Sequence, residues 1–519
     1  MKTIQRFKQQ LCWWTAVATG VFILRGIAAS GVASAAPLRI GIPSTHQSGD
    51  QACMFPDGTG GSPGAHCYTP AQFMQAYGID KLQNLGLTGK GQTIILVDSY
   101  GSPTQQNDLD VFSETFGLPR TKVQFIYPDG YYLNPMLTPD QQNWAAEAAL
   151  DVQIAHAIAP GATIVNVVTN SDEVEGLTGL PDMFAGIQMA LKQYPNGIVS
   201  MSFAAGEATF TNSNIQAFVK GQFHQILLQA TQAGMTLLAG SGDTGSTSPN
   251  YADTSLFSFP DQGYPGVDPL VTSVGGTWLQ AGWRWDPQGT VNQYWNCQVT
   301  GTCPFDFLNY VNTPDQTTEA VWKEDWLPAA TGGGVSAIFQ IPSYQATIGF
   351  ANLFILNGQR GVPDVAMNAA VDGGFEIFTS FNAPDIDQVG PIWTENGGTS
   401  CSVPEMATLV ALAGQEASET LHRNVGVGSL NPILYSLQPS DFNDTVPQTF
   451  GVYDQITLYN NVPYYNAAVL AAFGPLVSTP VPVPGYLTTR GYDLTTGWGS
   501  PNVVNFVNDV AAVVVRNNL

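Results

Sequence analysis

The chain has 519 residues, of which 44 % are hydrophobic and only 11 % are charged. Its 40 acidic and 17 basic side chains give a formal net charge of −23, which argues against nucleic acid or an anionic membrane as a partner. At about pH 4 much of this negative charge would be neutralised, and few Lys and Arg side chains would then repel one another. The composition therefore suggests an acidic working environment.

The N-terminus has the pattern of a secretion signal. Lys2 and Arg6 precede an apolar run at 11–24, and a small-residue cleavage pattern ends at Ala35. The run is too short for a comfortable membrane span, although Arg25 directly after it leaves an uncleaved anchor as the minor alternative. We predict a signal peptide at 1–36 and a secreted, extracellular, monomeric protein with no membrane partner after cleavage.

The cysteines agree with export into an oxidising compartment. Cys53 with Cys67, and Cys297 with Cys303, form two local pairs for which we predict short-loop disulfides. Cys401 is expected to be a buried small apolar side chain rather than a reactive thiol.

Beyond an irregular segment at 37–66, short apolar runs alternate with helical patterns. This alternation is typical of a parallel α/β sheet. The expected strands are 92–97, 162–168, 197–203, 235–239 and 269–274. The expected helices are 145–157, 181–193, 214–233 and the stretch that follows Ser400.

Two stretches have the composition of insertions. The first, 278–326, holds six of the eleven tryptophans and either rims a cleft or packs on itself. The second, 458–487, contains a Pro-Val-Pro-Val-Pro segment and is expected to run over the surface, partly as polyproline II.

A turn and a helix meet at Ser400. Gly397 and Gly398 allow a tight turn, and the residues after Pro404 are good helix formers. We expect Ser400 just before or within the first turn of a buried helix, with Pro404 also in that turn, where its missing N–H costs nothing. Taken alone, Ser400 is best interpreted as a helix N-cap.

Two carboxylates share one face of the predicted helix at 145–157. Glu147 and Asp151 are four residues apart, so they project from the same side. Their neighbours on the helix are almost all apolar, and no Lys or Arg lies within eight positions on either side. Two such carboxyls should titrate as a coupled pair with one pKa raised, which favours a functional site over a solvated polar face.

Two more aspartates follow strands. Asp243 lies in a glycine-rich turn after the strand at 235–239, at the sheet edge where ligands bind in open α/β folds. Asp98 ends the strand at 92–97 and either extends the carboxyl network behind Asp151 or simply forms a turn.

Histidine is scarce, with five in the chain. His156 lies five residues after Asp151, on another helical face, and is expected to be a packed or capping residue. The chain has no Gly-x-Ser-x-Gly elbow, phosphate-binding loop or Cys/His zinc pattern.

Together, these motifs resemble the sedolisins, the serine-carboxyl peptidases. The resemblance covers roughly residues 67–515 and rests on three motifs in the family's order. They are Glu147-x-x-Leu150-Asp151, Ser241-Gly242-Asp243-Thr244-Gly245 and Gly398-Thr399-Ser400-Cys401-Ser402-Val403-Pro404. The resemblance implies a subtilisin-like α/β fold with a mostly parallel central sheet, helices on both faces and a single large catalytic domain at 67–519.

The resemblance also implies roles for four residues in a secreted, acid-acting peptidase that cleaves polypeptides as an endopeptidase or a tripeptidyl peptidase. Ser400 would be the nucleophile, Glu147 its general base, Asp151 the residue that tunes Glu147, and protonated Asp243 an oxyanion donor. These roles suit acid, where imidazole is protonated and a coupled carboxyl is still a usable base. The strand edge at 200–204 would pair with the substrate backbone.

The family further implies calcium near the C-terminus, in a loop at 453–501. The metal ligands carried over are Ile456, Gly491 and Asp493, with Gln455 or Asp454 in place of the usual first Asp. Since calcium prefers several hard oxygen ligands, this exchange predicts weakened binding or its loss.

The sequence departs from the family in one further respect. Sedolisins carry a large folded pro-domain, whereas only the short segment 37–66 separates the predicted signal from the predicted domain. This departure motivates a second hypothesis, a catalytically silent sedolisin-like protein that binds polypeptide. A third hypothesis is a secreted non-peptidase hydrolase on the same fold.

Overall fold

The computed structural model describes residues 67–130, 137–173, 179–210, 213–249, 256–285, 310–324, 329–371, 373–381, 391–445, 483 and 485–519. The predicted signal peptide, the segment 37–66 and the Cys297–Cys303 pair lie outside the described residues, as does most of the stretch 458–487. Cys67 is disulfide-bonded, while its predicted partner Cys53 is also outside them.

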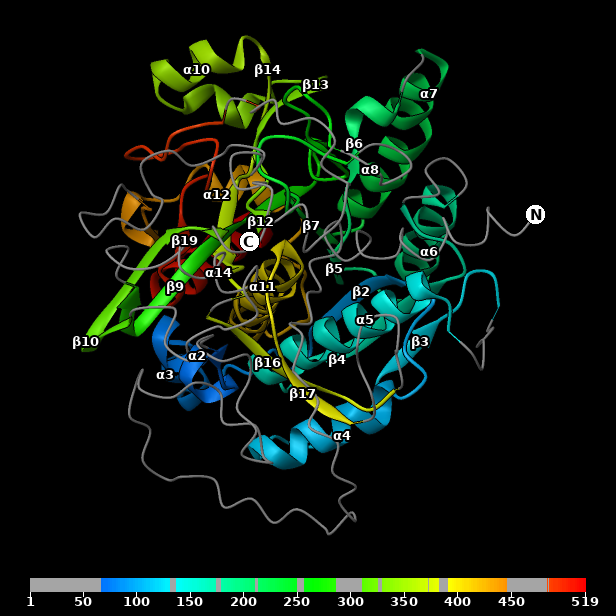
Figure 1. Ribbon diagram of the computed structural model, residues 1–519, viewed down its shortest axis with the longest axis vertical. Helices are drawn as coiled ribbons and strands as arrows, with labels where there is room; N and C mark the ends of the chain where they lie inside the picture. The colour runs from blue at the N-terminus through cyan, green and yellow to red at the C-terminus, as the bar shows by residue number, and fades with distance from the viewer. Residues whose placement is uncertain are drawn as a thin grey trace, which may run out of the picture.

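A large, mostly parallel sheet forms the centre of the molecule (Figure 1). Its strand order is β10-β9-β7-β5-β2-β4-β3, and β15 adds to β9 in parallel. The bounds are β2 Thr93–Ser99, β3 Gln124–Ile126, β4 Thr163–Thr169, β5 Ile198–Met201, β7 Thr236–Gly240, β9 Thr272–Trp285, β10 Tyr310–Val321 and β15 Val365–Asn368. Only β10 runs antiparallel to its neighbour, so the predicted parallel sheet is confirmed.

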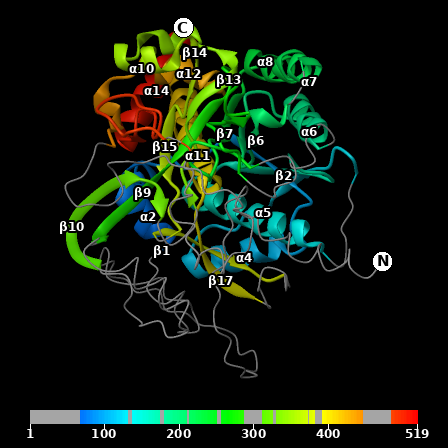
Figure 2. The same cartoon turned by 45° about the horizontal axis from the view of Figure 1, so that its top comes forward.

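Helices cover both faces of this sheet, as predicted (Figure 2). The helices α4 (Gln105–Phe116), α5 (Pro139–Ile158), α11 (Thr399–Leu421) and α14 (Val503–Asn518) pack on one face. The opposite face carries α6 (Leu180–Gln193), α7 (Ser213–Phe218) and α8 (His224–Gln232). Each face has its own core, because the strands between them are buried on both sides.

The first predicted insertion, 278–326, is described at 278–285 and 310–324. Within the described residues it consists of the long arms of β9 and β10, which pair with each other. Trp278 and Trp322 are fully buried there, so these parts belong to the core rather than to a separate surface loop.

Smaller elements complete the described fold. One small sheet contains β1 Cys67–Tyr68, β16 Gly374–Thr379 and β17 Ile392–Asn396, and β13 Gly334–Gln340 pairs with β14 Gln359–Val362. Three short strand pairs are β6 Ala205–Gly206 with β8 Gly263–Tyr264, β11 Lys323–Glu324 with β12 Ala329–Ala330, and β18 Phe442–Asn443 with β19 Ser500–Pro501. The remaining helices are α2 Pro70–Tyr77, α3 Ile79–Asn84, α10 Phe350–Leu356 and α12 Leu430–Leu434. Across the described ranges, no helix has the length and apolar character needed to cross a membrane.

Candidate active site

Helix α5 places two carboxyls inside the protein. It starts earlier than predicted, at Pro139, because Thr138 and Gln141 cap its N-terminus with reciprocal hydrogen bonds. The rest of the helix is mostly buried, and Glu147 and Asp151 are both 0 % exposed. The two carboxyls therefore lie in the layer that α5 shares with α11.

Helix α11 begins at a tight backbone turn. Gly398 has φ 92°, a conformation that favours glycine. A Cβ on Gly397 would lie 2.5 Å from the backbone N of Val371, so no side chain fits there. Ser400 is the second residue of the helix and is 3 % exposed, which confirms its predicted place in the first turn.

Pro404 lies deeper in α11 than predicted, as the sixth residue of the helix rather than in its first turn. A residue with an N–H at this position would donate to the Ser400 carbonyl, and proline cannot. The Ser202 Oγ lies 3.4 Å from that carbonyl oxygen instead. It also lies 3.0 and 2.9 Å from the two carboxyl oxygens of Asp151, so Ser202 links α11 to the carboxyl pair.

Glu147 interacts with Ser400 and is electrostatically coupled to Asp151. Burial and the charge of Asp151 raise the pKa of Glu147 well above its ordinary value of 4.5, while the Ser400 hydroxyl opposes the rise. Neither carboxyl oxygen of Glu147 has a hydrogen-bond partner of ordinary geometry. The contact with Ser400 is therefore looser than a standard hydrogen bond, as is common in catalytic sites without substrate.

Asp98 extends the carboxyl cluster behind Asp151. Burial and the charge of Asp98 raise the pKa of Asp151, and the hydrogen bond from Ser202 opposes this. Asp98 is itself 0 % exposed and accepts a hydrogen bond from Asn166, and burial raises its pKa to about 7. The position of Asp98 matches the hypothesis that it extends the carboxyl network, rather than the hypothesis that it only forms a turn.

Asp243 joins the site from the turn after β7. Its Oδ1 accepts hydrogen bonds from the backbone N–H and the hydroxyl of Thr399, at 2.8 and 2.7 Å. Its Oδ2 is buried without a partner. Burial raises the pKa of Asp243 to about 7, so in acid this carboxyl is protonated and can donate a hydrogen bond.

His156 and His224 contact groups outside the carboxyl cluster. The His156 Nε2 lies 2.7 Å from the carbonyl of Pro119, and burial lowers the pKa of His156, in line with its predicted packing role. His224 pairs with Asp268 at 2.8 Å. Cys401 is a free, buried thiol whose pKa is raised by burial, which confirms that expectation.

One predicted binding element is wrong in part. Ser200 and Met201 belong to the central strand β5, where β7 pairs with both and β2 also pairs with Ser200. Ser200 cannot pair with a substrate strand, because it is paired on both sides within the sheet, and Met201 is paired on its β7 side. Only the residues after Met201 remain candidates for that contact.

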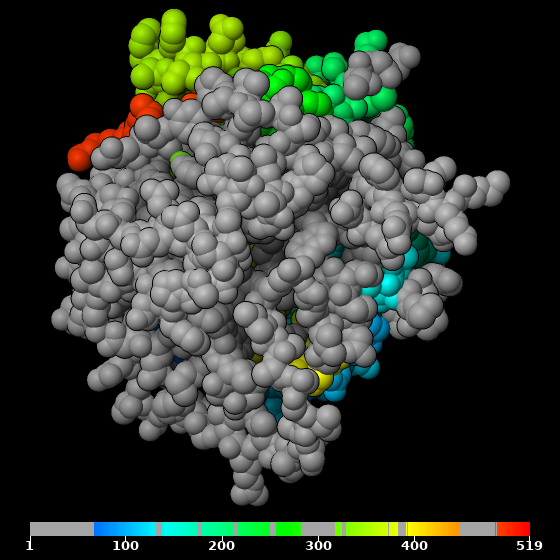
Figure 3. Space-filling model, viewed as in Figure 1, coloured from blue at the N-terminus to red at the C-terminus, as the bar shows by residue number. Residues whose placement is uncertain are grey.

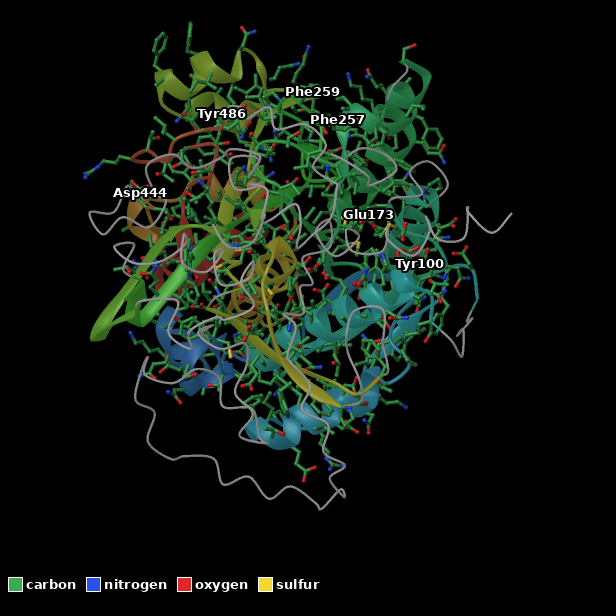
Figure 4. All side chains as sticks on the ribbon, viewed as in Figure 1. Tyr100, Glu173, Phe257, Phe259, Asp444 and Tyr486 are labelled. Atoms are coloured by element: carbon green, nitrogen blue, oxygen red, sulfur yellow. The ribbon has the colours of Figure 1, made fainter. Side chains whose placement is uncertain are left out.

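The predicted calcium ligands fit a metal poorly where they are described. The Asp493 Oδ1 accepts hydrogen bonds from the backbone and hydroxyl groups of Thr495 and Thr496, and its Oδ2 accepts one from Thr489. The N–H of Gly491 donates to Asp444 at 2.8 Å, near the edge of the fold (Figure 4). In the ranges covered by the structure, no group of three or more His, Cys, Asp or Glu side chains could hold a metal ion.

The other proposed calcium ligands, Ile456 with Gln455 or Asp454, lie outside the described residues. Calcium binding therefore remains a prediction, and no catalytic step is assigned to it.

Replacing Ser202 by alanine is expected to raise the pKa of Asp151 further, because it removes the hydrogen bond that lowers this pKa. The acid side of the activity profile should move to higher pH, and kcat should fall about tenfold. The measurement is kcat as a function of pH. Ser200→Ala is the matched control, since the Ser200 hydroxyl is buried without a partner. An unchanged pH profile in Ser202→Ala would remove Ser202 from the site.

The fold and this cluster define a class: a subtilisin-like α/β protein in which carboxyls, rather than a histidine, surround a serine at a helix start. No family model matches the chain. The chain is 29 % identical to kumamolisin from a Bacillus species over 402 residues, 76 % of this chain and 60 % of that protein. It is 24 % identical to sedolisin from a Pseudomonas species, over 80 % of this chain and 57 % of that protein.

A solved structure of Pseudomonas sedolisin, a serine-carboxyl proteinase complexed with pseudo-iodotyrostatin, has the same fold. The match has a TM-score of 0.58 and 21 % identity, and it covers 88 % of this chain and all of that one. The chain is thus similar in sequence and in fold to proteins named as sedolisins. It spans about three-fifths of the length of these curated relatives.

Proposed function

We propose that this protein is a secreted, acid-acting serine-type peptidase that hydrolyses peptide bonds through an acyl-enzyme on Ser400. The single observation that carries the proposal is the convergence of Ser400, Glu147 and Asp243 at the buried start of α11. Sequence similarity to the relatives named kumamolisin and sedolisin supports the proposal independently.

In the proposed first step, the Glu147 carboxylate takes the Ser400 proton as Oγ attacks the carbonyl carbon of the substrate. The negative charge that develops on the carbonyl oxygen accepts a hydrogen bond from protonated Asp243. Collapse of the intermediate breaks the C–N bond, and Glu147 returns the proton to the leaving amine. This leaves an acyl ester on Ser400.

In the second step, water replaces the amine. Glu147 accepts a proton from the water as it attacks the ester, and the intermediate collapses with return of that proton to Ser400. Burial and the coupling to Asp151 keep the pKa of Glu147 raised, so the two carboxyls release their protons as a pair. Ser202 holds Asp151 in place.

The proposed roles predict how the activity depends on pH. Activity should rise as the Glu147/Asp151 pair loses its first proton, an event that belongs to the pair rather than to either residue. Activity should fall again above about pH 7, because Asp243 then loses the proton that it donates. The measurement is digestion of denatured haemoglobin by the full chain from acid to neutral pH.

A variant without His156 serves as the control for that digestion. His156→Ala should keep the activity and its pH profile, since the His156 ring contacts the Pro119 carbonyl and not the carboxyl cluster. A folded protein that cleaves nothing at any pH would contradict the proposed function. Activity confined to pH values above 7 would also contradict it.

A further inference from the structure

Helix α10 presents large apolar side chains to solvent. Phe350 is 83 % exposed, Phe354 is 78 % exposed and Ile355 is 47 % exposed. Phe350 and Phe354 are four residues apart, so they stand on the same side of the helix. The helix lies at the upper edge of the molecule, and its atoms form part of the outermost layer there (Figure 3).

The opposite side of α10 is firmly held. Leu356 is 0 % exposed and packs with Ile348 and Leu494 in a small core of its own. Tyr486 also packs against this core and lies close to α10 and β14 (Figure 4). Asn352 donates a hydrogen bond to the carbonyl of Tyr492. The two phenylalanine rings are thus displayed by an anchored helix.

The surroundings of α10 carry no charge along the chain. Residues 326–359 contain no Asp, Glu, Lys or Arg. The next charged residue, Arg360, is 0 % exposed and pairs with Asp364 through a 2.8 Å hydrogen bond. Clustered exposed apolar side chains of this kind mark an interaction surface rather than ordinary solvent-facing residues.

The size of the surface argues against a stable dimer. Three partly exposed side chains offer at most about 500 Å² of apolar area, whereas a standard interface needs about 800 Å² from each partner. A lipid surface requires no complementary groove and accepts an apolar face to a depth of about 5–10 Å. Residues 326–359 hold no Lys or Arg that could attract anionic lipid, so the lipid is a neutral one.

We propose that α10 docks this protein on a neutral lipid surface, with Phe350 and Phe354 inserted between the headgroups. The sequence predicted no membrane partner, on the grounds of acidic charge and the lack of a spanning segment. Neither argument applies to a short helix that lies between the lipid headgroups and water. Docking of this kind is independent of Ser400 and would place the protein on lipid without a membrane span.

Co-sedimentation of the full chain with phosphatidylcholine vesicles tests the proposal. The unaltered protein should sediment with the vesicles, and each of Phe350→Ser and Phe354→Ser should lower the partition coefficient about tenfold. Leu85→Ser is the matched control, because Leu85 is 79 % exposed but lies after α3, away from α10. This control should bind vesicles like the unaltered chain, and circular dichroism should show that all variants are folded.

Three results would overturn the proposal. The first is a folded chain that stays in the supernatant with these vesicles. The second is equal binding by the unaltered chain and a Phe350→Ser/Phe354→Ser double variant. The third is a dimer in sedimentation velocity that dissociates in this double variant, which would assign α10 to a second copy of the chain.

Discussion

Replacing Ser400 by alanine is expected to lower kcat by about five to six orders of magnitude, and Glu147→Gln should lower it by a similar factor. The reason is that nucleophile and base act as one unit: Glu147 has no proton to accept without Ser400, and the Ser400 hydroxyl is a weak nucleophile without a base. The double variant should therefore be no slower than either single variant. The measurement is kcat for a soluble peptide substrate in acid.

Two outcomes would contradict this assignment. Strictly multiplicative losses in the double variant would mean that the two residues act separately. Activity retained in Glu147→Gln, in a protein that folds normally, would mean that another group is the base. The Ser200→Ala variant is a suitable control for the loss of a buried hydroxyl on the neighbouring strand β5.

Raising the pH from about 4 to 7 is expected to destabilise the fold strongly. Burial raises the pKa of Asp243 from 3.8 to about 7 and that of Asp98 also to about 7. Between these pH values the unfolded chain has released protons that the folded chain still holds, so the free energy of unfolding falls as pH rises. The loss from Asp243 alone is about 4 kcal/mol, fully incurred once its folded-state pKa is passed.

Thermal unfolding of the Ser400→Ala protein, which cannot digest itself, measures this effect. The melting temperature should be at least about 5 °C lower at neutral pH than in acid. Adding Asp243→Asn should reduce the difference, because asparagine keeps an acceptor for Thr399 and cannot ionise. A melting temperature that rises with pH would contradict the account of these buried carboxyls.

Much of the fold was accessible from the sequence because the signals were local. The central strands and the helices around Glu147 and Ser400 have strong periodicity or apolar runs, and each is found near its predicted place. The long β9–β10 arms were missed, because their pairing depends on residues far apart in the chain. Trp278 and Trp322 are buried there, which the composition alone does not reveal.

The site was predicted in part. Ser400, Glu147, Asp151 and Asp243 come together, but Ser202 was read only as part of a substrate-binding edge. Its hydroxyl contacts Asp151 and also lies near the Ser400 carbonyl, which Pro404 leaves without a helical donor. The sequence contains Pro404, but its effect on the Ser400 carbonyl can be predicted only when the first residue of α11 is known. Asn166 likewise reaches Asp98 only across neighbouring strands.

We propose that Ser400 forms a covalent acyl intermediate with a carboxylate as its base. Mass spectrometry of the protein, quenched during turnover of an activated ester at about pH 4, tests this most directly. We expect an acyl group on the peptide that contains Ser400, formed quickly in the unaltered chain and hardly at all in Glu147→Gln. Turnover with no acylated Ser400, or an acyl group on another residue, would contradict it.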